Sequence, residues 1–116
     1  MSDTLHEHIE TIEAGYEFLL AYAAQGRASD EGHGGSEIRS TLTGMSAAAS
    51  AIRTALEKDE SDFAQIVVDD AWKTAAAIAV VLAQAKISSE LVDNLNASIH
   101  VRALLTDLFL LSETTR

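Results

Sequence analysis

Apolar residues recur at alternating spacings of four and three along four segments of this chain, and no proline interrupts any of them. That spacing returns each apolar side chain to the same side of a helix, so each segment predicts an amphipathic α-helix. A proline would break a helix interior, and its absence from all 116 residues favours helix throughout. We therefore predict an all-α fold with helices over about residues 4–24, 37–58, 62–86 and 89–112.

Four helices of this length, joined by short connections, are typical of an antiparallel four-helix bundle. We expect a single four-helix domain over residues 1–116, a length usual for one domain. The one long loop is predicted at 25–36, because it holds four of the six glycines. Gly26 is placed to end the first helix, and Ser88 to cap the fourth.

The charge balance excludes several classes of function. Eighteen acidic residues against eight basic ones give a formal charge of −10, which repels the phosphate backbone of nucleic acids. The absence of cysteine excludes disulfides, thiolate metal sites and thiol nucleophiles. The first residues are polar and acidic, unlike a secretory signal, and no apolar run reaches bilayer length. We expect no nucleic-acid or membrane partner and a cytoplasmic location.

The segment 89–112 carries two apolar stripes on nearly opposite sides. The first stripe is Val92, Leu95, Ile99, Ala103, Thr106 and Leu110, and the second is Val101, Leu104, Leu105, Leu108 and Leu111. One bundle cannot cover both stripes, and an uncovered apolar face usually marks an interface. We therefore predict self-association, with an interface formed by Phe18, Tyr22, Val101, Leu104, Leu105 and Leu108.

A polar stripe on the first segment has the spacing of metal ligands. Imidazole and carboxylate groups three and four residues apart on a helix can converge on one divalent ion. In architecture alone the chain resembles the ferritin-like superfamily, but no Glu-x-x-His motif is present. The spacing of the stripe makes an iron, manganese or zinc site the alternative hypothesis, with the site completed across the bundle or a dimer. Its candidate ligands are His6, Glu10, Glu13, Glu17 and His100, and a solvated acidic helix face is the alternative interpretation.

No pattern in the sequence indicates catalysis. Serines and threonines are frequent, yet none lies in a recognisable strained turn, so we predict no catalytic residue. His100 is not followed by the lysine and glycine typical of histidine phosphotransfer domains. Two hypotheses remain. The first is a non-enzymatic protein without a cofactor that acts as a homodimer or as an adaptor for another protein. The second is a small ferritin-like protein that binds a divalent metal.

Overall fold

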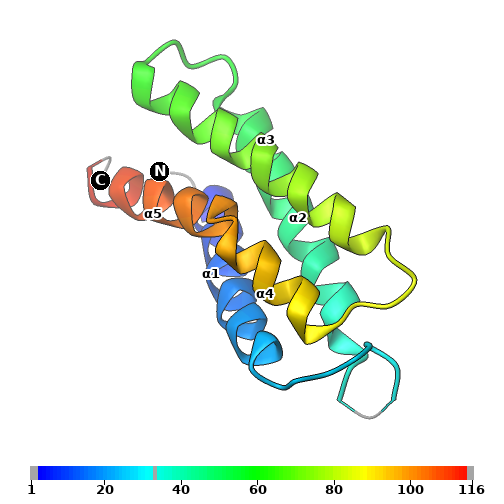
Figure 1. The fold of residues 1–116 in the computed structure, drawn as a ribbon. Helices are drawn as coiled ribbons and strands as arrows, with labels where there is room; N and C mark the ends of the chain where they lie inside the picture. The colour runs from blue at the N-terminus through cyan, green and yellow to red at the C-terminus, as the bar shows by residue number, and fades with distance from the viewer. Residues whose placement is uncertain (1–2, 33, 115–116) are drawn as a thin grey trace.

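The computed structural model describes residues 3–32 and 34–114, and all the regular structure in these ranges is helical (Figure 1). The predicted all-α class is confirmed. Five helices are present in the described part of the chain, where four were expected. They are α1 (Asp3–Ala23), α2 (Glu37–Leu56), α3 (Asp62–Leu82), α4 (Ser89–Ala97) and α5 (His100–Thr114).

The predicted helix ends are largely explained by local chemistry. Gly26 has a φ of 68°, the left-handed conformation expected just beyond α1. Ser88 caps α4, because its Oγ accepts a hydrogen bond from the Leu91 N–H at 3.0 Å. Ser61 caps α3 in the same way, through the Ala64 N–H at 3.3 Å.

The single helix predicted over 89–112 is wrong, because the chain breaks between α4 and α5 at Ser98 and Ile99. Ile99 has a φ of 63°, a conformation that side chains branched at Cβ rarely adopt. The Ile99 N–H donates to the Asn96 carbonyl at 3.1 Å, which closes α4 in a tight turn. We call this break the Ser98–Ile99 joint.

The joint changes which apolar stripe faces the core. On α4 the first stripe is buried, as Val92 and Leu95 show. Beyond the joint the helix is rotated, so the second stripe is buried instead and the first stripe turns outward. Ile99 and Leu110 of the first stripe are 58% and 54% exposed. The chain thus buries the first stripe along α4 and the second stripe along α5.

Helix contacts follow a simple pattern in Figure 1. α1 packs against α2, α4 and α5, and α3 packs against the same three helices. Within the described residues α1 and α3 do not contact each other, and α2 contacts neither α4 nor α5. α5 runs in the opposite direction to α3, and the two helices lie side by side.

The core is one connected cluster of apolar side chains drawn from every helix. Gly15 of α1 is buried there, and a side chain at this position would collide with Met45 of α2. Gly15 therefore permits the close approach of α1 and α2. The largest fully buried side chains include Ile12, Leu19, Tyr22, Ile38, Leu42, Met45, Ile52, Ile78, Leu104 and Leu108.

Candidate functional site between α3 and α5

The residues predicted to form an interface lie in the chain's own core, which corrects their assignment. Tyr22, Leu104 and Leu108 are fully buried, and Val101 and Leu105 are nearly so. Phe18 is half-buried and stacks on Tyr22, with ring centroids 6.3 Å apart. For the α5 residues the physical reason is the rotation at the joint, which turns the second stripe inward. Tyr22 of α1 is instead held inside by the hydrogen bond that its hydroxyl donates to the Ile87 carbonyl at 2.6 Å. A second chain would have to contact other side chains.

The predicted metal ligands are only partly brought together. His6 Nε2 lies 3.1 Å from Glu10 Oε1, on an exposed side of α1. Glu13 and Glu17 are also exposed, and His100 is half-buried at the start of α5. Over residues 3–32 and 34–114 no group of three or more His, Asp or Glu side chains is arranged to hold a metal. The metal site stays a prediction.

Two aspartates face each other across the contact between α3 and α5. Asp70 belongs to α3 and Asp107 to α5, and their side chains are within hydrogen-bonding reach when one of them carries a proton. The Oδ2 atom of Asp107 is buried and has no hydrogen-bond partner in the described structure. A buried oxygen without a donor disfavours the ionised form of its carboxyl group. We call Asp70 and Asp107 the carboxyl pair.

The surroundings of Asp107 change its acidity strongly. Burial removes water from its carboxyl group, and the neighbouring Asp70 adds a hydrogen bond to the neutral acid and a like charge. Together these effects raise the pKa of Asp107 to about 7, from an ordinary value of 3.8. Near neutral pH the pair therefore holds one proton part of the time. A carboxyl group that gains and loses a proton near neutral pH can act as an acid or a base. The spacing of residues in the sequence did not predict such a group here.

A buried threonine ties the same two helices together one turn away. Thr74 is fully buried, and its Oγ1 lies 2.8 Å from the Asp70 carbonyl and 3.0 Å from the His100 carbonyl. The hydroxyl has one proton to donate, so the two carbonyls share it. The first residue of α5 is thereby held against α3, directly after the Ser98–Ile99 joint.

A shallow hollow opens beside the carboxyl pair. It has a volume of about 260 Å³ and is lined by Ile99, Arg102, Ala103, Thr106 and Asp107. Its walls are mostly apolar, and Asp107 of the carboxyl pair is among its lining residues. The site thus combines a titratable pair, a joint in the backbone and an exposed apolar rim.

A second polar cluster lies where the long loop meets the end of α3, and it holds that loop in place. Asp30 accepts hydrogen bonds from Arg39 Nε at 2.8 Å and from the Ile87 N–H at 2.9 Å. Arg39 also donates to the carbonyls of Leu82, Gln84 and Ala85, at the end of α3. We call Asp30 and Arg39 the loop anchor.

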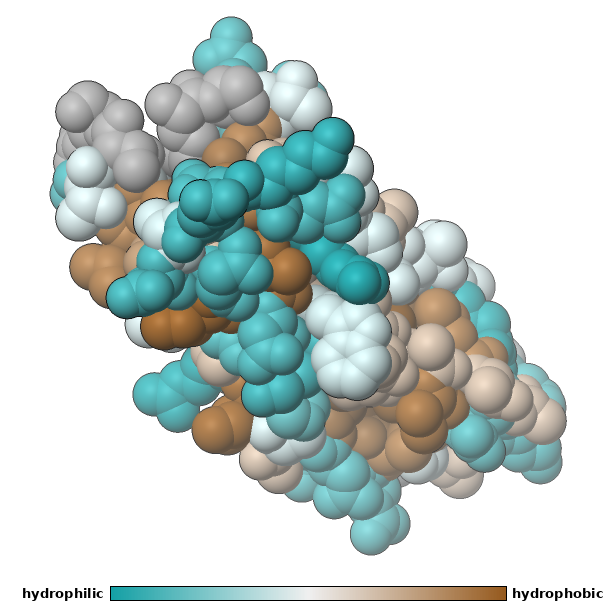
Figure 2. Space-filling model, turned by 90° about the horizontal axis from the view of Figure 1, so that it is seen from above, coloured by the Kyte–Doolittle hydropathy of each residue, from teal (hydrophilic) through white to brown (hydrophobic). Residues whose placement is uncertain are grey.

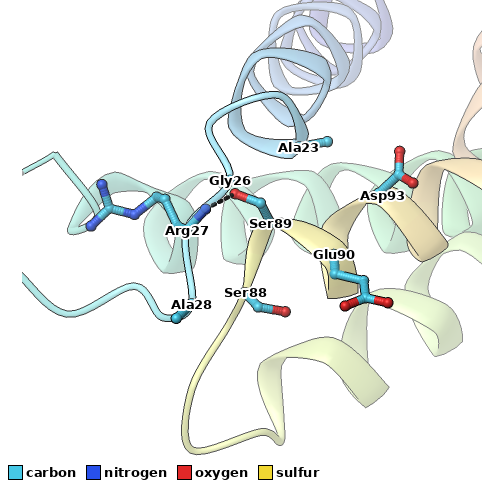
Figure 3. A pocket seen from close by; sticks show the side chains of 8 residues that line it. All are labelled: Ala23, Gly26, Arg27, Ala28, Ser88, Ser89, Glu90 and Asp93. Atoms are coloured by element: carbon cyan, nitrogen blue, oxygen red, sulfur yellow. Dashed lines mark hydrogen bonds between the residues drawn. The ribbon is translucent and has the colours of Figure 1, made fainter.

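A larger hollow of about 640 Å³ lies beside the loop, between the end of α1 and the start of α4 (Figure 3). Ser89 holds its wall together, because its Oγ accepts from the Arg27 N–H at 2.8 Å and donates to the Tyr22 carbonyl at 2.7 Å. Figure 3 shows the Arg27 side chain pointing away from the carboxylates of Glu90 and Asp93. The polar groups of this hollow thus serve mainly to join the loop to α4.

Comparison of the chain with protein-family models, with curated proteins and with solved structures finds no match. Among the described residues, none of the helices is both long enough and apolar enough to span a lipid bilayer. The cytoplasmic location expected from the sequence stays a prediction.

Proposed function

We propose that this protein acts by self-association, through the face where α3 and α5 meet. The observation that supports the proposal is a set of large apolar side chains left exposed there. Ile66 is 50% exposed, and Ile99 and Leu110 are more exposed still. Exposed apolar side chains gathered on one face are a common mark of protein interfaces, whereas scattered ones are ordinary.

Helix geometry supports the grouping of these side chains. Ile66 lies one turn before Asp70 on the same side of α3, and Leu110 lies one turn after Asp107 on α5. Because α3 and α5 run in opposite directions, the carboxyl pair brings Ile66 and Leu110 to the same level. Figure 2 shows hydrophobic surface among hydrophilic side chains; its broadest area lies toward the end of α3, where Val80 is 63% exposed, and is separate from Ile66 near the start of that helix.

The packing of α4 and α5 can be compared with that of the last helix in the predicted four-helix bundle. The α4–α5 pair packs against α1 and α3, as the last helix of a four-helix bundle would. We propose that the pair takes the place of that helix, with the joint as the point where its inward face changes. The outward-turned half of the first stripe is then the surface that a second copy covers.

Light scattering at micromolar concentration tests the proposal directly. The wild-type chain should have at least twice its 12.4 kDa mass at moderate salt, where the repulsion between chains of charge −10 is screened. Ile66→Glu combined with Leu110→Glu should return it to a monomer with an unchanged helical circular dichroism spectrum. Leu20→Glu is the matched control, because Leu20 is 48% exposed on α1 and should leave the mass unchanged.

Two results would contradict this assignment. A monomeric wild-type chain would remove self-association. An assembly that survives the Ile66 and Leu110 substitutions but dissociates with Leu20→Glu would move the interface to α1. Either outcome leaves the fold itself unaffected, since all three side chains are largely exposed.

Metal binding is the second candidate, and the contact between His6 and Glu10 favours it. Under this alternative a divalent ion, supplied as zinc, manganese or iron(II), raises the melting temperature by binding the folded state. His6→Gln or Glu13→Gln would remove that rise. If micromolar metal leaves the melting temperature of the wild type unchanged, the acidic stripe is a solvated helix face.

A further inference from the structure

The contact between α3 and α5 combines a short backbone connection to α4 with a pair of groups whose charge depends on pH. α5 is joined to α4 by only two residues, and one of them, Ile99, is held in an unfavourable left-handed conformation. Across the contact, α5 meets α3 through apolar side chains, the shared Thr74 hydroxyl and the carboxyl pair. Of these, the carboxyl pair alone changes its charge with pH.

The groups around Asp107 leave its charge uncompensated. From α3 it is faced by Asp70; Lys73 interacts with Asp70 through space, but its ammonium group is paired with Asp69 at 3.1 Å. On the other helices packed against α5, the titratable groups that are at least half-buried are His8, Tyr16 and Tyr22 of α1. The remaining titratable groups of these helices are exposed: Asp3, His6, Glu7, Glu10, Glu13 and Glu17 on α1, and Glu90 and Asp93 on α4. α5 itself also carries His100, Arg102 and Glu113. Only burial and Asp70 act on Asp107 appreciably, and both oppose its ionisation.

We propose that the carboxyl pair is a proton-dependent latch: a proton shared by Asp70 and Asp107 strengthens the packing of α5 against α3, and its loss weakens that packing and makes local opening of α5 at the Ser98–Ile99 joint more frequent. In the closed state the neutral carboxyl donates to its ionised partner. When the proton is lost, two carboxylates repel each other across the contact and weaken it. The proton passes to water, so no other reactant is needed.

The sign of the effect follows from the direction of the shift. The folded chain binds this proton more tightly than the unfolded chain, so closed α5 is favoured at low pH and weakened as pH rises. Because the pKa of Asp107 lies at about 7, the change falls within the neutral range. The latch does not depend on self-association, since both carboxyl groups and the joint belong to one chain.

Amide hydrogen exchange resolved along the chain tests the latch. After correction for intrinsic exchange rates, protection of the α5 amides should fall roughly tenfold between about pH 5 and about pH 8. Protection of α1 and α2 should change far less over the same range. Asp107→Asn keeps a neutral donor beside Asp70, so its α5 protection at high pH should match the low-pH value.

Two further variants keep the test decisive. Asp70→Asn removes the like charge and should reduce the pH dependence, although the burial of Asp107 keeps part of it; this variant covers the case in which the first one folds poorly. Asp93→Asn removes an exposed carboxylate on α4 and should behave as wild type. Wild-type α5 protection that is constant with pH would overturn the latch, as would a pH dependence that is undiminished in Asp107→Asn or in Asp70→Asn.

Discussion

The loop anchor and the carboxyl pair both join segments distant in the chain, but they are built in opposite ways. Each oxygen of the Asp30 carboxylate has a donor, Arg39 Nε for one and the Ile87 N–H for the other. The Asp107 carboxyl instead faces another carboxyl and leaves one buried oxygen without a donor. The first contact favours the charged form and the second favours the neutral one.

This difference separates a contact that fixes the fold from one that can respond to its surroundings. The Ile87 N–H and the Arg39 guanidinium hold the pKa of Asp30 below its usual value, so its charge is constant at neutral pH. The pKa of Asp107 is raised to about 7. Only the second group can change its charge in the neutral range.

Breaking the loop anchor should have the largest effect on stability. Arg39→Met removes the donor shared by Asp30 and three carbonyls at the end of α3. We expect a loss of about 2–3 kcal/mol in the free energy of unfolding, measured by urea denaturation at neutral pH. Arg53→Met, at an exposed position of the same helix, should change it little. Equal losses of unfolding free energy in the two variants would show that the loop anchor stabilises the fold no more than an exposed arginine does.

Neutralising Asp30 should also destabilise the fold, with a defined pH dependence. Asp30→Asn is expected to lower the free energy of unfolding by about 1–2 kcal/mol at neutral pH. Because the pKa of Asp30 is lowered in the folded state, its contribution is present above the ordinary value of 3.8 and is lost as pH falls below it. Denaturation curves of wild type and variant should therefore converge in acid. A constant difference would contradict this origin.

Neutralising Asp107 should have the opposite sign. The raised pKa means that wild-type stability falls as pH rises from about 4 to about 7 and then levels off. Asp107→Asn should therefore stabilise the fold by about 1 kcal/mol at about pH 8, after allowance for partial solvent screening, and change little at about pH 5. Urea denaturation at both pH values measures this, with Asp93→Asn as the control for removing one negative charge. Destabilisation at both pH values would contradict the account.

Removing the threonine hydroxyl should have the smallest effect and act on the same contact. Thr74→Val keeps the shape of the side chain but leaves the His100 carbonyl without this donor. A loss of about 0.5–1 kcal/mol is expected from thermal denaturation, with no change in its pH dependence. If the pH dependence of stability disappeared as well, the carboxyl pair would not be an independent contact.

Much of the fold could be predicted from the sequence, because helix periodicity and caps are local. The stripes through Leu5 and Ile9, the Ser88 cap and the Gly26 turn are all present as expected. The joint was missed because both apolar stripes continue through it at helical spacing. The one local signal is the run of Asn94, Asn96 and Ser98, which are poor helix formers and good turn residues.

The polar contacts could not be predicted, since each depends on tertiary packing. Asp70 and Asp107 belong to different helices, and they meet because α3 and α5 pack against each other. Arg39 reads in sequence as one more charged residue on a helix, yet it reaches the end of α3. Such pairings are set by which helices become neighbours, and helical spacing carries no information about that.

The account is tested most directly by titrating the aspartate side-chain carboxyl carbons in the wild-type chain by NMR. Asp30 and Asp107 are followed in the same sample, each serving as the reference for the other. We expect the Asp30 signal to have its midpoint below 3.8, and the Asp107 signal to have its midpoint near 7. An Asp107 midpoint at or below 3.8 would show that its carboxyl is ionised and satisfied like that of Asp30, and would contradict the contrast between the two sites.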